Sequence, residues 1–180
     1  MKKIRRMVGV TAAAAALVVS AFATPGAASA DDGPYPKAGE HCTGWEEVYG
    51  QGGYTFTAFR TCVYVYDRAG RSAMFIETDK NTYWWGGAWY NATPLYSASV
   101  FATVHMGANV AQGGPAVTAR NSWTQKSRSS KLSLGSIGII KCGIRDLDVS
   151  YTQVGGYYGE DRKIDVKRSY DDFVIPCSMD

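Results

Sequence analysis

Aromatic side chains crowd into one short segment, residues 83–90, where five of eight positions carry rings around a Gly-Gly pair. Aromatic faces can stack on the apolar faces of sugar rings, and the polar groups of Tyr and Trp can hydrogen-bond hydroxyls. The same residue types dominate the energetic centres of protein interfaces. The segment is therefore the main candidate binding site, and its aromatic members are Tyr83, Trp84, Trp85, Trp89 and Tyr90.

An alternative is that these rings only close one end of the core, since each buries about 150–250 Å². In a strand, Trp84 and Trp85 point to opposite faces, so at most one of them fills the core. Some aromatic surface is then exposed, and exposed apolar patches usually mark recognition. A second candidate binding surface is Tyr157-Tyr158, which follows Gly155-Gly156 in an expected turn.

Residue types used in catalysis are present, but their arrangement does not indicate an active site. The chain has two histidines, His41 and His105, and no G-x-S-x-G nucleophile motif accompanies them. Glu77 and Asp79 would share one face of a strand, which makes them the best candidates for the carboxylate pair of a hydrolase. Charged residues at a strand end more often serve solvation, so the sequence predicts no enzyme and no cofactor.

Four cysteines form an even set in a chain with an export signal, which predicts two disulfides. We favour the pairs Cys42–Cys62 and Cys142–Cys177, because near neighbours in sequence meet first. The alternative, Cys42–Cys177 with Cys62–Cys142, would tie the two ends of the chain together. Each bridge should stabilise the fold by about 3–4 kcal/mol. Their spacing does not suit a zinc site, so we expect no metal.

The first thirty residues have the pattern of a secretory signal peptide. Basic residues within 2–6 precede an alanine-rich apolar stretch, 8–23, and Ala28-Ser29-Ala30 supplies the small residues of a cleavage site. The apolar stretch is short for a membrane span, which needs about 20 residues. The sequence therefore predicts a signal peptide over 1–30, cleavage near Ala30, a secreted product and no membrane association.

Cleavage would also change the charge of the protein. The whole chain has a net charge of +3, but without the four basic residues near its start fifteen Lys and Arg remain against sixteen Asp and Glu, or about −1. The basic footprint of a nucleic-acid-binding protein is then absent. The alanine-rich export segment and the Gly/Tyr/Thr-rich remainder resemble small secreted disulfide-bonded β proteins of Streptomyces-type actinobacteria. This resemblance covers no motif, identifies no specific family and implies only the compartment.

The elements that must position these residues are short strands. Residues 31–41 are polar and interrupted by Pro and Gly, which predicts a flexible N-terminal arm, and 42–180 form a single domain. Apolar alternation slips by one residue near Arg145-Asp146, which requires a bulge or turn. Expected strands span residues 55–66, 72–77, 97–106, 116–125, 131–134, 137–144, 147–154 and 163–170. The fold class is all-β, an antiparallel β-sandwich or a small barrel.

Two classes of function follow from these patterns. The first is a secreted, non-catalytic protein-interaction module: an adaptor in an extracellular assembly, or an inhibitor of a secreted enzyme with a secreted protein partner. Actinobacterial inhibitors of amylases and proteases resemble this chain in fold class only, and the Trp-Arg-Tyr loop of the amylase inhibitors is absent. The alternative is a lectin-like carbohydrate-binding module that uses the Tyr83–Tyr90 cluster. A small secreted hydrolase acting through Glu77 is a third hypothesis.

Overall fold

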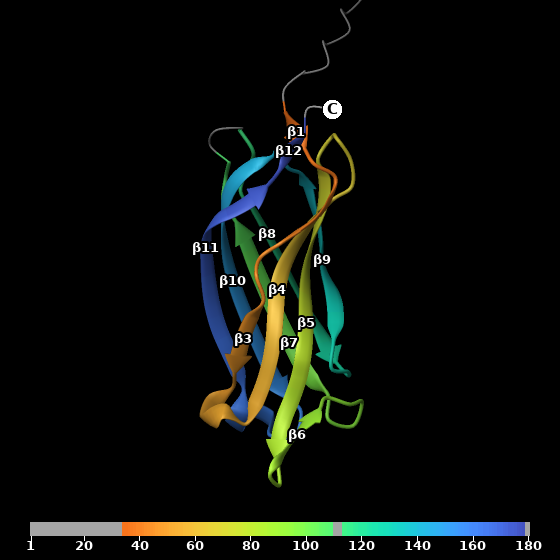
Figure 1. Ribbon diagram of the computed structural model, residues 1–180, viewed down its shortest axis with the longest axis vertical. Coiled ribbons are helices and arrows are strands. Elements are labelled where there is room, and N and C mark those ends of the chain that lie inside the picture. The colour runs from red at the N-terminus through yellow and green to blue at the C-terminus, as the bar shows by residue number, and fades with distance from the viewer. Residues whose placement is uncertain (1–33, 110–112, 179–180) are drawn as a thin grey trace, which may run out of the picture. The chain divides into compact units, whose positions relative to one another are not determined.

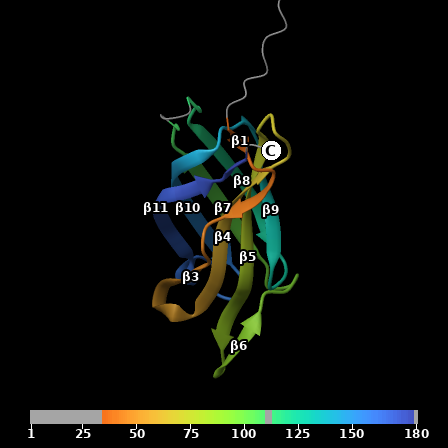
Figure 2. The same cartoon turned by 45° about the horizontal axis from the view of Figure 1, so that its top comes forward.

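The computed structural model describes residues 34–109 and 113–178, and these residues form antiparallel β-sheets (Figures 1 and 2). Their helical turns are η1 (Gln51–Gly53) and η2 (Gly159–Arg162). The predicted all-β sandwich with two disulfides is confirmed, and the sheets do not close into a barrel. The predicted signal peptide, 1–30, lies outside the described residues.

Two main sheets face each other and are joined at one end by a two-stranded ribbon. The larger sheet contains β2 (Gly39–Cys42), β3 (Glu46–Tyr49), β4 (Thr55–Val65), β5 (Arg71–Trp85), β6 (Ala88–Asn91) and β9 (Ser130–Ile139). The smaller sheet has the order β11 (Ile164–Ile175), β10 (Gly143–Gly155), β7 (Ala98–Met106), β8 (Val117–Gln125). The ribbon pairs β1 (Tyr35–Pro36) with β12 (Cys177–Ser178).

Alternate residues of the central strands β7 and β10 point inward and fill the space between the sheets, as the period of two dictates. Phe59 of β4 stacks on Tyr151 of β10 across the two layers, with ring centroids 4.7 Å apart and planes 3° from parallel. Burial strongly raises the pKa of the Tyr151 hydroxyl, which donates a hydrogen bond to Gln153 Oε1 at 2.7 Å. The pair therefore ties the two sheets together near the middle of the core.

The predicted slip of the apolar phase is confirmed as a register shift of β10 against β11 between Arg145 and Leu147. The strand predicted over 97–106 is confirmed as β7. In contrast, residues 131–134 and 137–144 do not form separate strands, because β9 runs through both Gly135 and Gly138. Both glycines have positive φ and irregular pairing with β5 follows, so they bend the strand without ending it.

The favoured disulfide pairing, Cys42–Cys62 and Cys142–Cys177, is confirmed. Strand pairing explains it, because β2 lies beside β4 with Cys42 opposite Cys62. The flexible arm expected over 31–41 is wrong for residues 35–36 and 39–41, which belong to β1 and β2. Polar composition suggested a free segment, but backbone pairing with β12 and β4 holds it.

The strand predicted over 72–77 is much longer in the structure, since β5 continues to Trp85 and turns directly into β6. The β5–β6 hairpin lies at the opposite end of the sandwich from the β1–β12 ribbon (Figure 1). In the described part of the chain, no helix is long and apolar enough to cross a bilayer.

Candidate functional site: the aromatic hairpin

The aromatic segment is a tight hairpin. Gly86 and Gly87 have φ of 54° and 90°, the left-handed values that a two-residue turn of this kind demands. Trp85 pairs with Ala88, and Trp84 pairs with Trp89 in the next row. The glycines are therefore required by the backbone, and they bring the two aromatic runs side by side.

The hairpin separates its aromatic side chains onto two faces. Tyr83 pairs with Tyr90, so these two rings share a face with Trp85, while Trp84 and Trp89 share the other. The prediction that consecutive tryptophans point opposite ways is confirmed. Neither Trp84 nor Trp85 belongs to the main buried core.

The face that carries Tyr83, Trp85 and Tyr90, here called the tyrosine face, receives a third segment of the chain. Tyr157 lies 4.5 Å from Trp85 and 5.7 Å from Tyr83 between ring centroids. Tyr96 lies 5.6 Å from Tyr83. The structure thus joins two surfaces that the sequence treats separately, and burial raises the pKa of Tyr83 at their centre.

Tyr158 contacts the hairpin at its base. Its hydroxyl donates to the Trp84 carbonyl at 2.6 Å, and its ring lies 5.6 Å from that of Tyr54. The guanidinium of Arg162 lies over the Tyr54 ring at 4.7 Å. Tyr158 therefore positions the hairpin. Of the second predicted surface, Tyr157-Tyr158, only Tyr157 adds an exposed ring to the tip.

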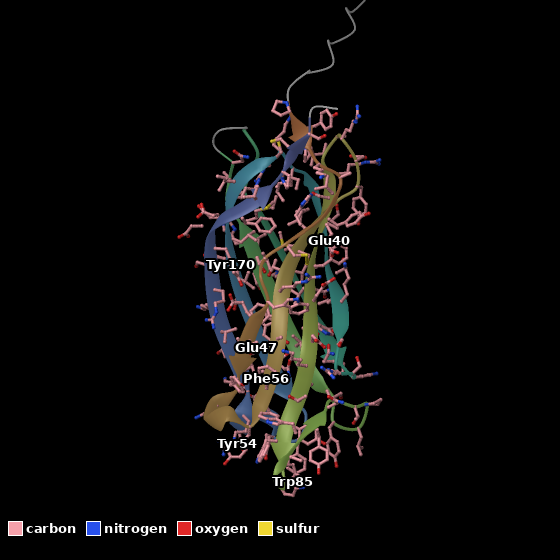
Figure 3. All side chains as sticks on the ribbon, in the orientation of Figure 1. Glu40, Glu47, Tyr54, Phe56, Trp85 and Tyr170 are labelled. Carbon is pink, nitrogen blue, oxygen red and sulfur yellow. A yellow bond between two sulfur atoms is a disulfide. The ribbon has the colours of Figure 1, made fainter. Side chains whose placement is uncertain are left out.

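The opposite face forms a hollow of about 310 Å³, here called the Trp89 hollow. Its aromatic wall comes from two strand pairs: Phe56 lies 6.2 Å from Trp89 and 4.7 Å from Tyr49 between ring centroids. Trp84 packs edge-on against Trp89 at 5.6 Å. Phe56 lies above the hairpin tip, marked by Trp85, in Figure 3. The full lining is Tyr49, Phe56, Lys80, Thr82, Trp89, Asn91 and Arg128.

A β-bulge brings Lys80 to the hollow. Phe56 pairs with Thr82, but Ala58 pairs with Asp79, so β5 has one extra residue between these pairs. Lys80 has φ of 57° there, a left-handed conformation that only a few per cent of non-glycine residues adopt. Such strain concentrates at binding sites, where it redirects a side chain. The Lys80 ammonium contacts Glu47 Oε1 at 2.8 Å.

The neighbouring Asn81 holds Arg128 beside the hollow. Its side chain is fully buried, accepts a hydrogen bond from Thr57 Oγ1 at 2.7 Å and donates to the Arg128 carbonyl at 2.9 Å. Its backbone N–H donates to the same carbonyl at 3.0 Å. Asn81 thus fixes the 126–129 connection against the bulge through its side chain and its backbone. The polar edge of the hollow is therefore preformed.

The cationic groups of the hollow are each matched by a carboxylate. Lys80 contacts Glu47, and Arg128 Nε lies 3.6 Å from Asp79 Oδ1. The hydrogen bond from Ser129 lowers the pKa of Asp79, and the hydrogen bond with Glu47 raises the pKa of Lys80. Both shifts favour the charged forms of Asp79 and Lys80, and each cationic side chain of the hollow lies beside an acidic one.

The carboxylates proposed for a hydrolase do not form a pair with separated pKa values. Burial of Glu77 would raise its pKa, but the hydrogen bonds from Lys131 and Arg60 outweigh this and lower it. Arg60 Nη2 and Lys131 Nζ lie 2.6 and 2.9 Å from the Glu77 carboxylate. Because the pKa of Asp79 is also lowered, both carboxyl groups are held ionised. Glycoside hydrolysis needs one of the two protonated. A structural role explains Glu77 better.

Replacing Glu77 by Gln should therefore lower the free energy of unfolding at pH 7 by about 1–3 kcal/mol, because charged hydrogen bonds are lost. A lowered folded-state pKa stabilises the fold above the unfolded value of 4.5, and that stability disappears as the pH falls through the folded value. Urea unfolding at pH 7 and pH 3 should show the difference shrinking in acid. Glu47→Gln, which removes an exposed ion pair, is the control and should cost less than about 1 kcal/mol. An equal loss for Glu77→Gln at both pH values would contradict this account.

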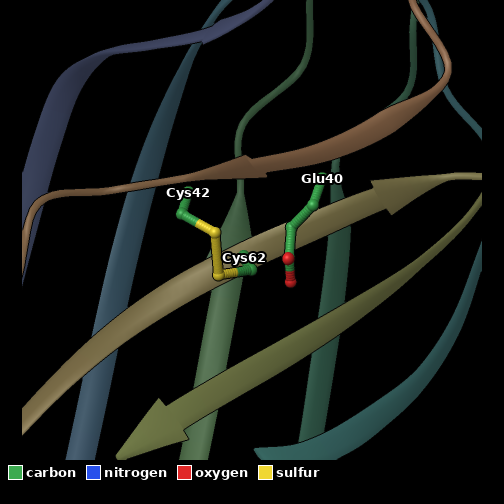
Figure 4. Close-up of side chains that lie close together, drawn as sticks. All are labelled: Glu40, Cys42 and Cys62. Atoms are coloured by element: carbon green, nitrogen blue, oxygen red, sulfur yellow. A yellow bond between two sulfur atoms is a disulfide. The ribbon is translucent and has the colours of Figure 1, made fainter.

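Two other places in the structure hold residue types that could do chemistry. Glu40 lies beside Cys42 and Cys62 (Figure 4), but the two sulfurs are bonded to each other and the carboxylate contacts Lys131. No thiolate is available there to hold a metal. His105 lies on the outer face of β7 and shares a hydrogen bond of 2.9 Å with Thr118 Oγ1. His105 is therefore an exposed side chain on a strand, with no carboxylate among its hydrogen-bond partners in the described residues.

The sequence alone does not indicate most of the Trp89 hollow. Composition points to Trp89, but nothing in the sequence places Tyr49 and Phe56 beside it, since these residues come from β3 and β4. The connection between β8 and β9 gives a weak signal in the sequence, because Lys126 to Lys131 is a short basic polar stretch that contains Arg128. Comparison of the chain with family models, curated proteins and solved structures gives no match.

Proposed function

We propose that this protein is a secreted, non-catalytic, lectin-like module that binds a neutral glycan in the Trp89 hollow. The carrying observation is the composition of the hollow: aromatic rings form its wall, while an amide, a hydroxyl and paired charges form its edge. A sugar ring has the matching chemistry, since its C–H face is apolar and its rim carries hydroxyls. Trp89 would take the ring face, and Thr82 and Asn91 would take hydroxyls.

The charge balance of the hollow favours an uncharged ligand. Lys80 and Arg128 already have Glu47 and Asp79 as partners, so an anionic sugar would have to displace these carboxylates or lie beside them. A neutral glycan can hydrogen-bond the same groups without disturbing the pairs. Secretion suits this role, and two disulfides and a sequence that begins like a signal peptide support it.

Retention on polysaccharides tests the proposal. Neutral polymers (a β-glucan, a xylan, a mannan and chitin) should be compared with anionic polygalacturonate, each with and without 0.5 M NaCl. We expect retention on at least one neutral polymer, little affected by salt because stacking is not screened. Failure on every neutral polymer, or retention only on the anionic one and lost in salt, would contradict the proposal.

A protein partner is the second candidate, and the tyrosine face favours it. Trp85, Tyr90 and Tyr157 expose 51%, 46% and 38% of their surface next to one another. Clustered exposed Tyr and Trp are typical of interface centres. An adaptor or an enzyme inhibitor would use this face, and its binding should depend on Trp85, while glycan binding should not.

A further inference from the structure

Strand β6 is an open edge of the larger sheet. It pairs with β5 and, among the described strands, with no other, so one side of its backbone has no strand beside it. The Ala92 N–H donates to the Asn81 carbonyl, which shows that residues of β6 with even numbers bond toward β5. The N–H and C=O groups of Trp89 and Asn91 therefore point away from the sheet.

This edge is short, at four residues, but it lacks the charged side chains and prolines with which many proteins discourage strand pairing. Lysine, proline, charged side chains and bulges commonly protect sheet edges. The edge strand β11 of the other sheet has several charged residues, and β2, β3, β8 and β9 each have at least one. Strand β6 reads Ala-Trp-Tyr-Asn and has neither a charge nor a proline.

We propose that β6 pairs with β6 of a second copy of this chain, antiparallel and about a two-fold axis at Tyr90. In this register Trp89 of each copy lies opposite Asn91 of the other, and the pair exchanges the backbone hydrogen bonds that each strand leaves open. Shifting the register would leave some of these groups unpaired. The strand is therefore complementary to itself, which a two-fold interface requires.

The side chains agree with this pairing. Tyr90 of each copy would meet its equivalent in a non-hydrogen-bonded pair, where opposite Cβ atoms lie about 4.5–5.5 Å apart and aromatic pairs are favourable. Because Tyr90 is 46% exposed on the tyrosine face, such a contact would cover apolar surface. On the other face the two Trp89 hollows would lie side by side, and linked sites raise the apparent affinity for a polymer. The dimer does not depend on what the hollow binds.

Sedimentation velocity from about 1 to 300 µM tests the dimer, since so small an interface should dissociate in the range of tens of micromolar. The wild type should show a concentration-dependent dimer. Tyr90→Lys and Tyr90→Glu should each stay monomeric, because like charges would meet on the axis. An equimolar mixture of the two variants should form a heterodimer. Leu95→Lys is the control, since this residue is 80% exposed in the loop after β6, and it should dimerise like the wild type.

A wild type that stays monomeric over the whole range would overturn the proposal, as would dimers of Tyr90→Lys or a mixture without heterodimers. If β6 instead pairs with a peptide of another protein, the wild type would stay monomeric, which is the first of these outcomes. Tyr90 lies outside the Trp89 hollow, so the monomeric variants should still bind a glycan oligosaccharide. Loss of the dimer and failure of the glycan proposal are therefore separate results.

Discussion

Replacing Arg145 by Met should lower the free energy of unfolding by about 3–5 kcal/mol. The side chain is 1% exposed, and the guanidinium is held by backbone carbonyls: Nη1 donates to Gly107 and Pro115 at 3.1 Å, and Nη2 donates to Lys141 at 3.4 Å. A hydrogen bond made by a charged group is worth about 1.5–3 kcal/mol, and the substitution removes all of these bonds together. Burial lowers the pKa of Arg145, which indicates how closely the site surrounds it.

The loss should be specific to this position, because Arg145 lies at the bulge of β10 and connects it to the carbonyls of Gly107 and Pro115. Arg120→Met on the exposed face of β8 is the matched control and should change stability by less than about 0.5 kcal/mol. Chemical denaturation of the two variants and the wild type measures the difference. An Arg145→Met protein within 1 kcal/mol of the wild type would show that the carbonyl cluster needs no cation.

Replacing Trp89 by Ala should weaken binding of a neutral oligosaccharide at least 30-fold. A buried aromatic contact at the centre of a site is worth about 2 kcal/mol or more, and 1.4 kcal/mol corresponds to a factor of ten. Trp89 is 44% exposed in the free protein and packs against Phe56 and Trp84, so its indole is already oriented. Isothermal titration calorimetry with the oligosaccharide of the best-retained polymer gives the ratio.

The hairpin supplies its own control for this prediction. Trp85 is similarly exposed, four residues away and on the opposite face, so Trp85→Ala should change affinity less than threefold. Both variants should keep the circular dichroism of the wild type, since neither tryptophan belongs to the main core. Equal losses for the two variants would place the ligand at the tip of the hairpin and not in the Trp89 hollow.

The period of the apolar residues revealed much of the fold. The alternation over 97–106 defined β7, and the phase slip at Arg145 located a real bulge. Cysteine spacing led to the correct disulfides because the paired strands are close in sequence. The pattern fails where glycine or polar composition predicts an interruption, as at Gly135 and in residues 35–36 and 39–41, because backbone pairing overrides local preference.

The candidate site was harder to predict for a similar reason. Gly86-Gly87 between two aromatic runs is a hairpin signal, and it separates Trp85 from Trp89 once the strand period is applied. Nothing local indicates that Phe56 of β4 lies beside Trp89. The bulge that turns Lys80 toward the hollow depends on pairing with β4, so it too is invisible in the order of residues along β5.

Indole N–H signals in a ¹⁵N-labelled sample test the central claim, glycan binding in the Trp89 hollow, most directly. The chain has five tryptophans, and each gives one such signal, assignable by single substitutions. On titration with a neutral oligosaccharide from the retained polymer, we predict saturable shifts of the Trp89 signal, smaller shifts of Trp84, and unchanged signals from Trp45, Trp85 and Trp123. Saturable shifts that spare Trp89, or no shifts at millimolar ligand, would contradict the account.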